Sequence, residues 1–223
     1  MKAIVLLSGG LDSATALYWT MRKGFRPLCL IFDYGQKHVK EIRCAESVAK
    51  KAGVPREIVG FRLPWGGSSL TDPGMKLPRD RSPERMAGGG IPSTYVPARN
   101  TIFLSFALSY ADAAGARAVV IGANAVDYSG YPDCRPAYLR AVQRAASLGT
   151  RTGAEGGKIR ILAPLVRMTK GDIVRLGTRL GAPYALTWSC YRGGAKPCRR
   201  CDSCLIREKG FREAGIPDPA LAG

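Results

Sequence analysis

A short glycine-containing string after the first apolar run constrains this chain more than any other feature. Residues 2–7 form a continuous apolar stretch ending in Leu7, suited to a strand buried on both faces of a parallel sheet. Ser8-Gly9-Gly10-Leu11-Asp12-Ser13 follows at once, and a helix is predicted from Asp12 to about residue 23. N–H groups at such a helix start form a cradle for phosphate, and Asp12 can cap the helix or hold Mg²⁺. We therefore expect residues Leu7 to Ser13 to bind ATP, though not as a Walker A loop, since no Gly-Lys-Ser/Thr follows.

Strand and helix patterns alternate along most of the chain. This alternation predicts an α/β fold with a parallel sheet and right-handed crossovers. Residues 62–97 interrupt it with many Gly and Pro residues, and we expect a long loop there that covers a substrate. We place one domain at residues 1–186 and a cysteine-rich tail at 187–223. The predicted strands are 27–32, 56–61, 117–122 and 158–162, and the predicted helices are 36–52, 100–114, 136–148, 170–180 and 204–214.

Four cysteines in the tail have metal-ligand spacing. Cys190, Cys198, Cys201 and Cys204 follow the pattern Cys-x7-Cys-x2-Cys-x2-Cys. Four thiolates in so short a segment suit a tetrahedral structural zinc ion, and nearby Arg and Lys residues would offset the negative charge of that centre. An iron–sulfur cluster or disulfides are the alternatives.

The composition limits the cellular setting and the partners. Hydrophobic residues make up 46% of the chain, yet no apolar run approaches the roughly 18 residues of a membrane span. With no signal-peptide pattern, we expect a soluble cytoplasmic protein whose seven cysteines serve metal or thiol chemistry. Lys and Arg number 34 against 17 Asp and Glu, a net charge of +17. That excess favours phosphorylated or polyanionic partners, although a solvated basic surface explains it equally well.

The string at residues 8–13 resembles the PP-loop of the N-type ATP pyrophosphatases, which bind ATP and activate a carbonyl or carboxyl oxygen by adenylation. Four further strings narrow the resemblance. They are Asp33-Tyr-Gly-Gln-Lys-His38-x2-Glu41, Tyr95-Val-Pro-Ala-Arg-Asn100, Asp127-Tyr-Ser-Gly-Tyr-Pro-Asp-Cys-Arg-Pro136 and Ser189-Cys-Tyr-x-Gly. With the loop and the cysteines, they closely resemble the 7-cyano-7-deazaguanine synthase family over essentially the whole chain.

The resemblance implies a Rossmann-like adenine-nucleotide domain, one structural zinc per chain, Mg²⁺ bound with ATP, and a homodimer. One departure concerns the cysteine tail. The family commonly has Gly after the second zinc cysteine, where this chain has Arg199 and Arg200 before Cys201. The ligand spacing is unchanged, but the local turn is expected to differ.

The reaction that the resemblance implies joins 7-carboxy-7-deazaguanine to ammonia with ATP, first as an amide and then as a nitrile. Arg99 suits a bidentate grip on the substrate carboxylate or a phosphate, and Lys170 suits the developing pyrophosphate charge. Either residue could instead be an ordinary surface group. Asp127 or Asp133 could accept hydrogen bonds from the guanine-like edge, and Tyr128 or Tyr131 could stack on the ring. The remaining candidates in these strings are Asp33, Gln36, His38, Tyr95, Asn100 and Arg135.

Two other functions are compatible with parts of this pattern. A tRNA-modifying PP-loop enzyme would explain the charge and the cysteines, but one nucleotide domain and the tail use almost the whole chain. A non-enzymatic zinc module that binds nucleic acid would leave the phosphate-loop string unexplained. We therefore expect no obligatory nucleic acid in the reaction and no membrane.

Overall fold

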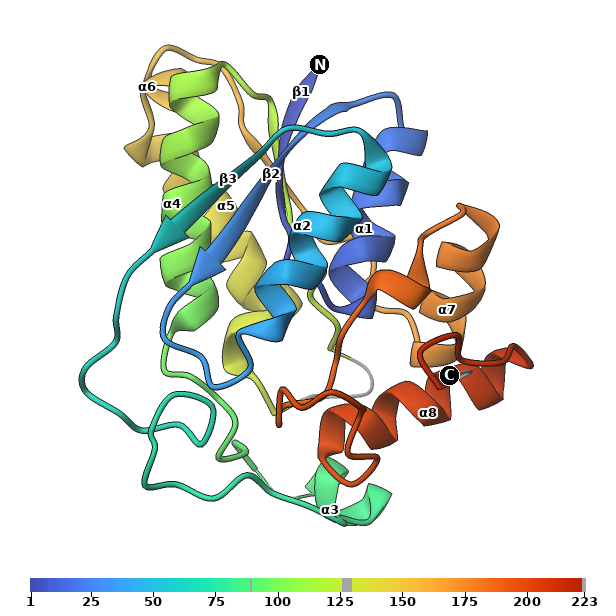
Figure 1. Cartoon of the computed structure of the whole chain (residues 1–223). Helices are drawn as coiled ribbons and strands as arrows, with labels where there is room; N and C mark the ends of the chain where they lie inside the picture. Colours follow the sequence, from blue (N-terminus) through green and yellow to red (C-terminus); the bar gives the residue numbers. More distant parts are fainter. Residues whose placement is uncertain (89, 126–129, 222–223) are drawn as a thin grey trace.

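A computed structural model describes residues 1–88, 90–125 and 130–221 of the chain. Five parallel strands form one sheet in the order β3-β2-β1-β4-β5, and helices cover both of its faces (Figure 1). The strands are β1 (Lys2–Leu6), β2 (Arg26–Asp33), β3 (Arg56–Gly60), β4 (Ala118–Val120) and β5 (Arg160–Leu162). The helices are α1 (Leu11–Arg22), α2 (Lys40–Ala52), α3 (Pro83–Gly88), α4 (Arg99–Ala114), α5 (Pro136–Gly149), α6 (Arg151–Ala154), α7 (Lys170–Arg179) and α8 (Asp202–Ala214), with 3₁₀ turns at Pro132–Cys134 and Tyr184–Leu186.

The alternation of side chains along β1 divides the core into two layers. Ala3, Val5 and Leu7 face α1, α2 and α7, whereas Ile4 and Leu6 face α4 and α5. All five side chains are buried, as a strand in the middle of a covered parallel sheet requires. The α/β fold with a parallel sheet flanked by helices is therefore confirmed.

The strand order places a topological switch point beside β1. The chain runs from β1 to β2 and β3 on one side, then returns to add β4 and β5 on the other. Parallel α/β sheets bind ligands at the carboxyl ends of the strands where the order reverses. Here the segments at that edge are the loops after β1, β2 and β4.

The predicted elements agree with the structure except in details. The helix expected from residue 36 begins at Lys40, because the Gln36 side chain folds the preceding turn. Its Oε1 accepts from the Tyr34 N–H at 2.9 Å, and its Nε2 donates to the Phe32 carbonyl at 3.1 Å. Strands β4 and β5 are shorter than predicted, and α3, α6 and the two 3₁₀ turns had no clear pattern.

The long loop packs against the cysteine tail, beyond the carboxyl ends of the strands (Figure 1). Arg79 pairs with Cys201 in an isolated antiparallel bridge, and the Arg81 guanidinium forms an ion pair with the fully buried Asp202. Its expected role as a cover over a substrate stays a prediction.

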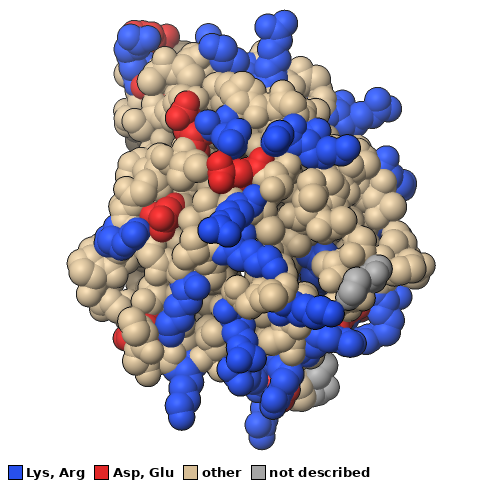
Figure 2. Space-filling model, in the orientation of Figure 1, with Lys and Arg blue, Asp and Glu red and all other residues tan. Residues whose placement is uncertain are grey.

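The surface is strongly basic. Figure 2 shows Lys and Arg side chains spread over the face seen in Figure 1, most densely over its lower half, with few acidic groups between them. Among the described residues, no helix combines the length and hydropathy needed to cross a bilayer.

Candidate active site and metal centre

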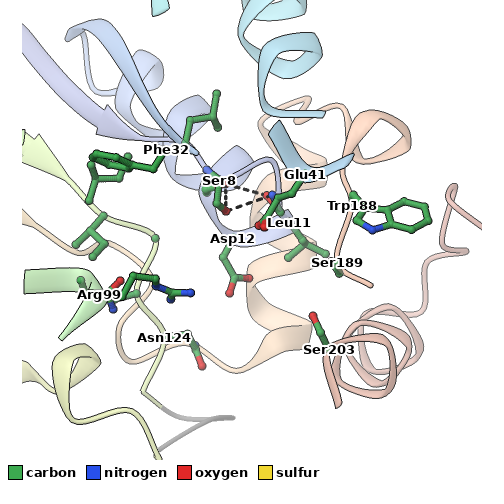
Figure 3. Close-up of a pocket in the computed structure, with 18 of the residues that line it drawn as sticks. Ser8, Leu11, Asp12, Phe32, Glu41, Arg99, Asn124, Trp188, Ser189 and Ser203 are labelled. Carbon is green, nitrogen blue, oxygen red and sulfur yellow. Dashed lines mark hydrogen bonds between the residues drawn. The ribbon is translucent and has the colours of Figure 1, made fainter. Parts of the chain in front are cut away.

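A pocket of about 280 Å³ opens at the carboxyl edge of the sheet (Figure 3). The phosphate loop, which we define as residues 8–13, forms one wall. The starts of α2 and α4, the segment after β4, the start of α7 and the cysteine tail form the others. Polar and charged lining residues are Ser8, Asp12, Ser13, Gln36, His38, Glu41, Arg99, Asn100, Asn124, Lys170, Ser189, Ser203 and Arg207.

Hydrogen bonds within the phosphate loop fix its shape. Ser13 Oγ accepts from the Ser8 N–H at 3.2 Å and donates to the Gly10 carbonyl at 3.1 Å. Gly10 is the N-cap of α1, and no side chain caps this helix. The first N–H groups of α1 therefore remain free to bind an anion. Asp12 does not act as the cap that the sequence allowed.

The two glycines of the loop serve different purposes. Gly9 has φ +84°, and a Cβ there would lie 2.2 Å from the Glu41 carbonyl oxygen and 2.7 Å from the Ala45 nitrogen. Gly9 thus lets the loop pack against α2. At Gly10 a Cβ would meet nothing closer than 3.5 Å, and Gly10 lines the pocket. Of the two glycines, Gly10 is the one among the residues that line the pocket.

Exchanging the two glycines separately should distinguish packing from binding. We expect Gly9→Ala to lower the free energy of unfolding by roughly 3 kcal/mol or more, because a left-handed φ and a backbone clash add together. Gly10→Ala should keep stability within about 1 kcal/mol of the original chain and weaken ATP binding. Urea unfolding and nucleotide titration measure the two effects. Equal stability of the two variants would contradict the packing role of Gly9.

Lys170 reaches the phosphate loop from α7. Its Nζ lies 2.8 Å and 2.7 Å from the two carboxylate oxygens of Asp12, and the residue is 9% exposed. Thr169 begins α7 with a capping box, so the helix start that carries Lys170 is firmly set. A Cβ on Gly210 would lie 2.3 Å from Lys170 Cγ, so α8 makes room for this side chain. Lys170 therefore lies beside the phosphate loop, and its role toward pyrophosphate stays a prediction.

Arg99 stands at the other side of the pocket, where α4 begins (Figure 3). Its Nη1 lies 3.5 Å from the Tyr34 hydroxyl, and its guanidinium carbon lies 5.7 Å from the centre of the Phe103 ring. Nε is buried and has no hydrogen-bond partner among the described residues. Burial raises the pKa of Tyr34, so this hydroxyl is neutral at physiological pH. Arg99 therefore offers a positive charge and unused donors to an anionic ligand.

Other predicted residues line the pocket but have local partners. Tyr131 shares a hydrogen bond of 2.8 Å with Thr94, and Asn100 donates to Cys134 Sγ at 3.3 Å. Desolvation by burial raises the pKa of Cys134 to about 12, which leaves a neutral thiol. Gln36 is occupied by the turn described above.

Four further candidates, Asp133, Asp33, Tyr95 and Arg135, are not among the residues that line this pocket. Asp133 Oδ2 accepts from the Asn100 N–H at 3.0 Å and so holds the start of α4. Asp33 pairs with Arg62 at 3.2 Å, and the Tyr95 hydroxyl accepts from the Ala98 N–H at 2.9 Å. Arg135 is exposed before α5. Asp127 and Tyr128 lie outside the described residues.

His38 and Glu41 form a hydrogen-bonded pair at the start of α2. His38 Nε2 lies 2.7 Å from Glu41 Oε2, and His38 is only 5% exposed. Both residues line the pocket, and Figure 3 places Glu41 beside the phosphate loop. Glu41 ends the string that begins at Asp33, but the sequence pattern indicated no chemical role for it.

Several lining residues come from parts of the sequence whose pattern did not mark them as site residues. The Trp188 N–H donates to the Gly9 carbonyl at 2.9 Å, which joins the start of the tail to the phosphate loop. Two of these residues had a signal in the sequence. Ser189 precedes the first tail cysteine in a string already noted, and Asn124 follows β4 at the switch point, where ligands bind. Ser203 and Arg207 lie on α8, where no local pattern pointed to a pocket.

The four tail cysteines converge. Their Sγ atoms all lie within 4.8 Å of one another, and the cluster could hold a metal ion. Hydrogen bonds from the Cys201 and Cys204 thiols lower the pKa of Cys190, which favours a thiolate at that position. All seven cysteines are free thiols in this structure, which does not support the alternative that the tail cysteines form disulfides.

The donor set fits zinc. Zn–S bonds of 2.3 Å in a tetrahedron separate the sulfurs by about 3.8 Å, within the spread of this cluster. An iron–sulfur cluster binds its cysteines through different iron atoms and needs them farther apart. The N–H groups of Cys198 and Cys201 donate to Cys190 and Cys198 Sγ at 3.3 Å and 3.4 Å. Such backbone donors stabilise thiolate ligands.

Comparison with known proteins assigns the chain to a family. The model of the family "Queuosine biosynthesis protein QueC" matches residues 2–215. The chain belongs to the QueC family. A 7-cyano-7-deazaguanine synthase of Trichodesmium erythraeum is 54% identical over 223 residues, which cover 99% of this chain and 100% of that protein. The corresponding synthase of Anaeromyxobacter sp. strain Fw109-5 is 53% identical over 225 residues, 99% of this chain and 95% of that protein.

Solved structures share the fold at low sequence identity. A predicted subunit of a tRNA methyltransferase from Methanocaldococcus jannaschii aligns with a TM-score of 0.51 at 14% identity, covering 99% of this chain and 91% of its own. The NMN synthetase of Francisella tularensis aligns with a TM-score of 0.50 at 16% identity, covering 99% and 80%. These likenesses concern the fold alone.

Proposed function

We propose that the chain is a 7-cyano-7-deazaguanine synthase that converts 7-carboxy-7-deazaguanine and ammonia, through the amide, to the nitrile at the expense of ATP. The observation that carries this proposal is the pocket itself. It combines an uncapped helix start at the phosphate loop with an arginine that has unused donors at the opposite side. Full-length similarity to proteins of that name supports the same activity.

The chemistry requires that an unreactive carboxylate become a good electrophile. Arg99 binds and orients the substrate carboxylate, whose oxygen attacks the α-phosphorus of ATP held at the phosphate loop. Pyrophosphate leaves, and the acyl carbon then bears AMP as a leaving group. Lys170 stabilises the pyrophosphate charge, and Asp12 would hold Mg²⁺, which would screen the phosphates of bound ATP. A second adenylation, on the amide oxygen, allows dehydration to the nitrile.

The cysteine tail has a structural part in this proposal. Cys190, Cys198, Cys201 and Cys204 would hold one zinc ion per chain, closed to substrate because all four positions are protein ligands. The tail then positions Trp188 and Ser189 beside the phosphate loop. We further propose that the enzyme is a homodimer that works in the cytoplasm, where ATP and reduced thiols are available.

The decisive assay omits RNA. We expect mass spectrometry to find the amide and then the nitrile when the free deazapurine acid is incubated with the enzyme, Mg·ATP and ammonium. Because the substrates are small, the rate should change little with added salt, unlike RNA docking, which releases counterions. Absence of both products, together with modification once tRNA is added, would contradict this function and favour a tRNA-modifying enzyme.

A further inference from the structure

The pocket holds an acidic side chain that pairs with no lysine or arginine in the described part of the chain. Asp12 and Glu41 are the acidic residues among the described lining of the pocket. Asp12 is paired with Lys170. Glu41 has His38 as its ion-pair partner and no lysine or arginine among the residues that the structure describes. The neighbouring Lys40 is directed elsewhere, because its Nζ donates to the Gly194 and Ala195 carbonyls at 3.2 Å and 2.9 Å.

His38 fixes the orientation of this carboxylate. Its Nε2–H donates to Glu41 Oε2 at 2.7 Å, and the Glu41 side chain is 19% exposed. The other carboxylate oxygen, Oε1, faces the phosphate loop. A Cβ placed on Gly10 would lie 3.9 Å from it. The Nδ1 atom of His38 is buried without a partner among the described residues. An oriented carboxylate thus stands beside the place where the phosphate chemistry occurs.

A carboxylate beside a phosphate loop repels ATP, and so it is expected only where it binds something cationic. The chain as a whole has a net charge of +17, and basic side chains cover the face in Figure 2, so it repels small cations in general. Ammonia is mostly ammonium at neutral pH. An enzyme with this surface needs a local negative charge to bring ammonium to the reacting carbon.

We propose that Glu41, oriented by His38, binds the ammonium ion and accepts its proton. This inference rests on the function proposed above. Ammonium donates hydrogen bonds to Glu41 Oε1 and gives up one proton to it, which passes on to solvent at the pocket mouth. The ammonia left on the carboxylate attacks the acyl carbon of the adenylate. The C–N bond forms, the C–O bond to AMP breaks, and the electron pair leaves with the phosphate oxygen.

The same carboxylate then completes the step. The nitrogen carries three protons after the attack, and one of them passes to Glu41 as the amide forms. Glu41 is placed equally well for the N–H protons that the amide loses when its activated oxygen departs with AMP. Positioned general bases contribute about 10²- to 10⁴-fold to such proton transfers. Arg99 acts on the opposite side of the pocket, on the oxygen rather than the nitrogen (Figure 3).

The variant Glu41→Gln tests the proposal, because it keeps the size of the side chain and an acceptor for His38. We expect kcat/KM for ammonium to fall by about 100-fold or more. Pyrophosphate release that depends on the deazapurine acid, measured without ammonium, should stay within about threefold of the original rate. Trapping by hydroxylamine, a neutral nucleophile at pH 7, should also persist. Glu46→Gln is the matched control, since Glu46 lies on the same helix and pairs with Arg56 at 3.1 Å.

Each outcome of this test has one meaning. An unchanged dependence on ammonium in Glu41→Gln would overturn the proposal. An equal loss of pyrophosphate release and hydroxylamine trapping would also overturn it, because Glu41 would then serve the binding of ATP or the acid. Failure of the original chain to release pyrophosphate with the acid would instead refute the proposed function. Unfolding curves of the two glutamine variants guard against loss of the fold.

Discussion

Replacing Asp12 by alanine is expected to lower turnover by about 10³-fold or more while leaving the fold intact. The carboxylate contacts Lys170 Nζ through both oxygens and faces the pocket, so its removal leaves a buried cation without its partner. It also removes the group that we assign to Mg²⁺. The side chain contributes no apolar core contact, but the unpaired Lys170 should cost about 1–3 kcal/mol of stability, so we expect a folded variant with a lower unfolding midpoint. Steady-state rates at saturating ATP and thermal unfolding of the same preparation measure both effects.

Ser13→Ala should lower turnover by a similar factor, because the phosphate loop loses hydrogen bonds that fix its shape. The Ser13 hydroxyl joins the Ser8 N–H to the Gly10 carbonyl and lies 3.1 Å from Ser8 Oγ, and so it fixes the shape of the loop. Glu155→Ala is the control for removing a carboxylate, because Glu155 is exposed and forms a long ion pair of 3.8 Å with Arg151, far from the pocket lining. An Asp12→Ala enzyme with the original rate would remove the phosphate loop from the mechanism.

The sequence predicts this loop because everything that defines it is consecutive. A buried strand, the string of residues 8–13 and a helix follow one another, and parallel packing then determines which edge of the sheet the loop occupies. The cysteine tail is predictable for the same reason, because ligand spacing within fifteen residues already limits how the sulfurs can meet. In both cases, residues that are neighbours in the sequence are also neighbours in the folded structure.

Contacts between distant segments are what the sequence did not reveal. Lys170 and Asp12 are 158 positions apart, and only the packing of α7 beside α1 makes them a pair. Arg81 and Asp202 likewise meet because the long loop crosses the tail. No periodicity or spacing encodes such pairs, since they depend on how several elements pack together.

Residue type also does not determine the role of a polar side chain. Asp133 was expected to face a ligand, yet its carboxylate accepts the Asn100 N–H and fixes the start of α4. Gly9 belongs to the predicted phosphate loop, yet it packs against α2. An aspartate that caps a helix and one that binds a substrate use the same acceptor atoms, so only the neighbours distinguish them.

Hydrogen bonds connect the cysteine tail to the phosphate loop. We therefore expect loss of the metal to lower the activity. The Trp188 N–H donates to the Gly9 carbonyl, and the Trp188 indole N–H donates to the carbonyl of Cys190 at 2.8 Å. Lys40 Nζ lies 3.5 Å from the centre of the Trp188 ring, so α2 is fixed to the same residue. Displacement of Cys190 would therefore disturb the loop that binds phosphate and the helix that carries Glu41.

Cys198→Ser is accordingly expected to lose the metal, much of the stability and most of the activity together. A tetrahedral thiolate site that loses one ligand binds its ion far more weakly, and the tail depends on that ion because its own apolar cluster is small. We expect less than about one tenth of a zinc per chain, and a loss of roughly 3 kcal/mol, which corresponds to about 6–12 °C in Tm for a domain of this size. Elemental analysis and calorimetry on the same sample measure the two quantities.

Cys44→Ser is the matched control for this experiment. Cys44 packs against the same cluster but is not among the four converging sulfurs, and burial raises the pKa of its thiol. Its variant should keep a full zinc and most of the Tm. Full zinc content in Cys198→Ser would refute the ligand set. Loss of zinc with an unchanged turnover rate would instead show that the path from Cys190 through Trp188 to Gly9 does not support the phosphate loop, and the tail would then be independent of catalysis.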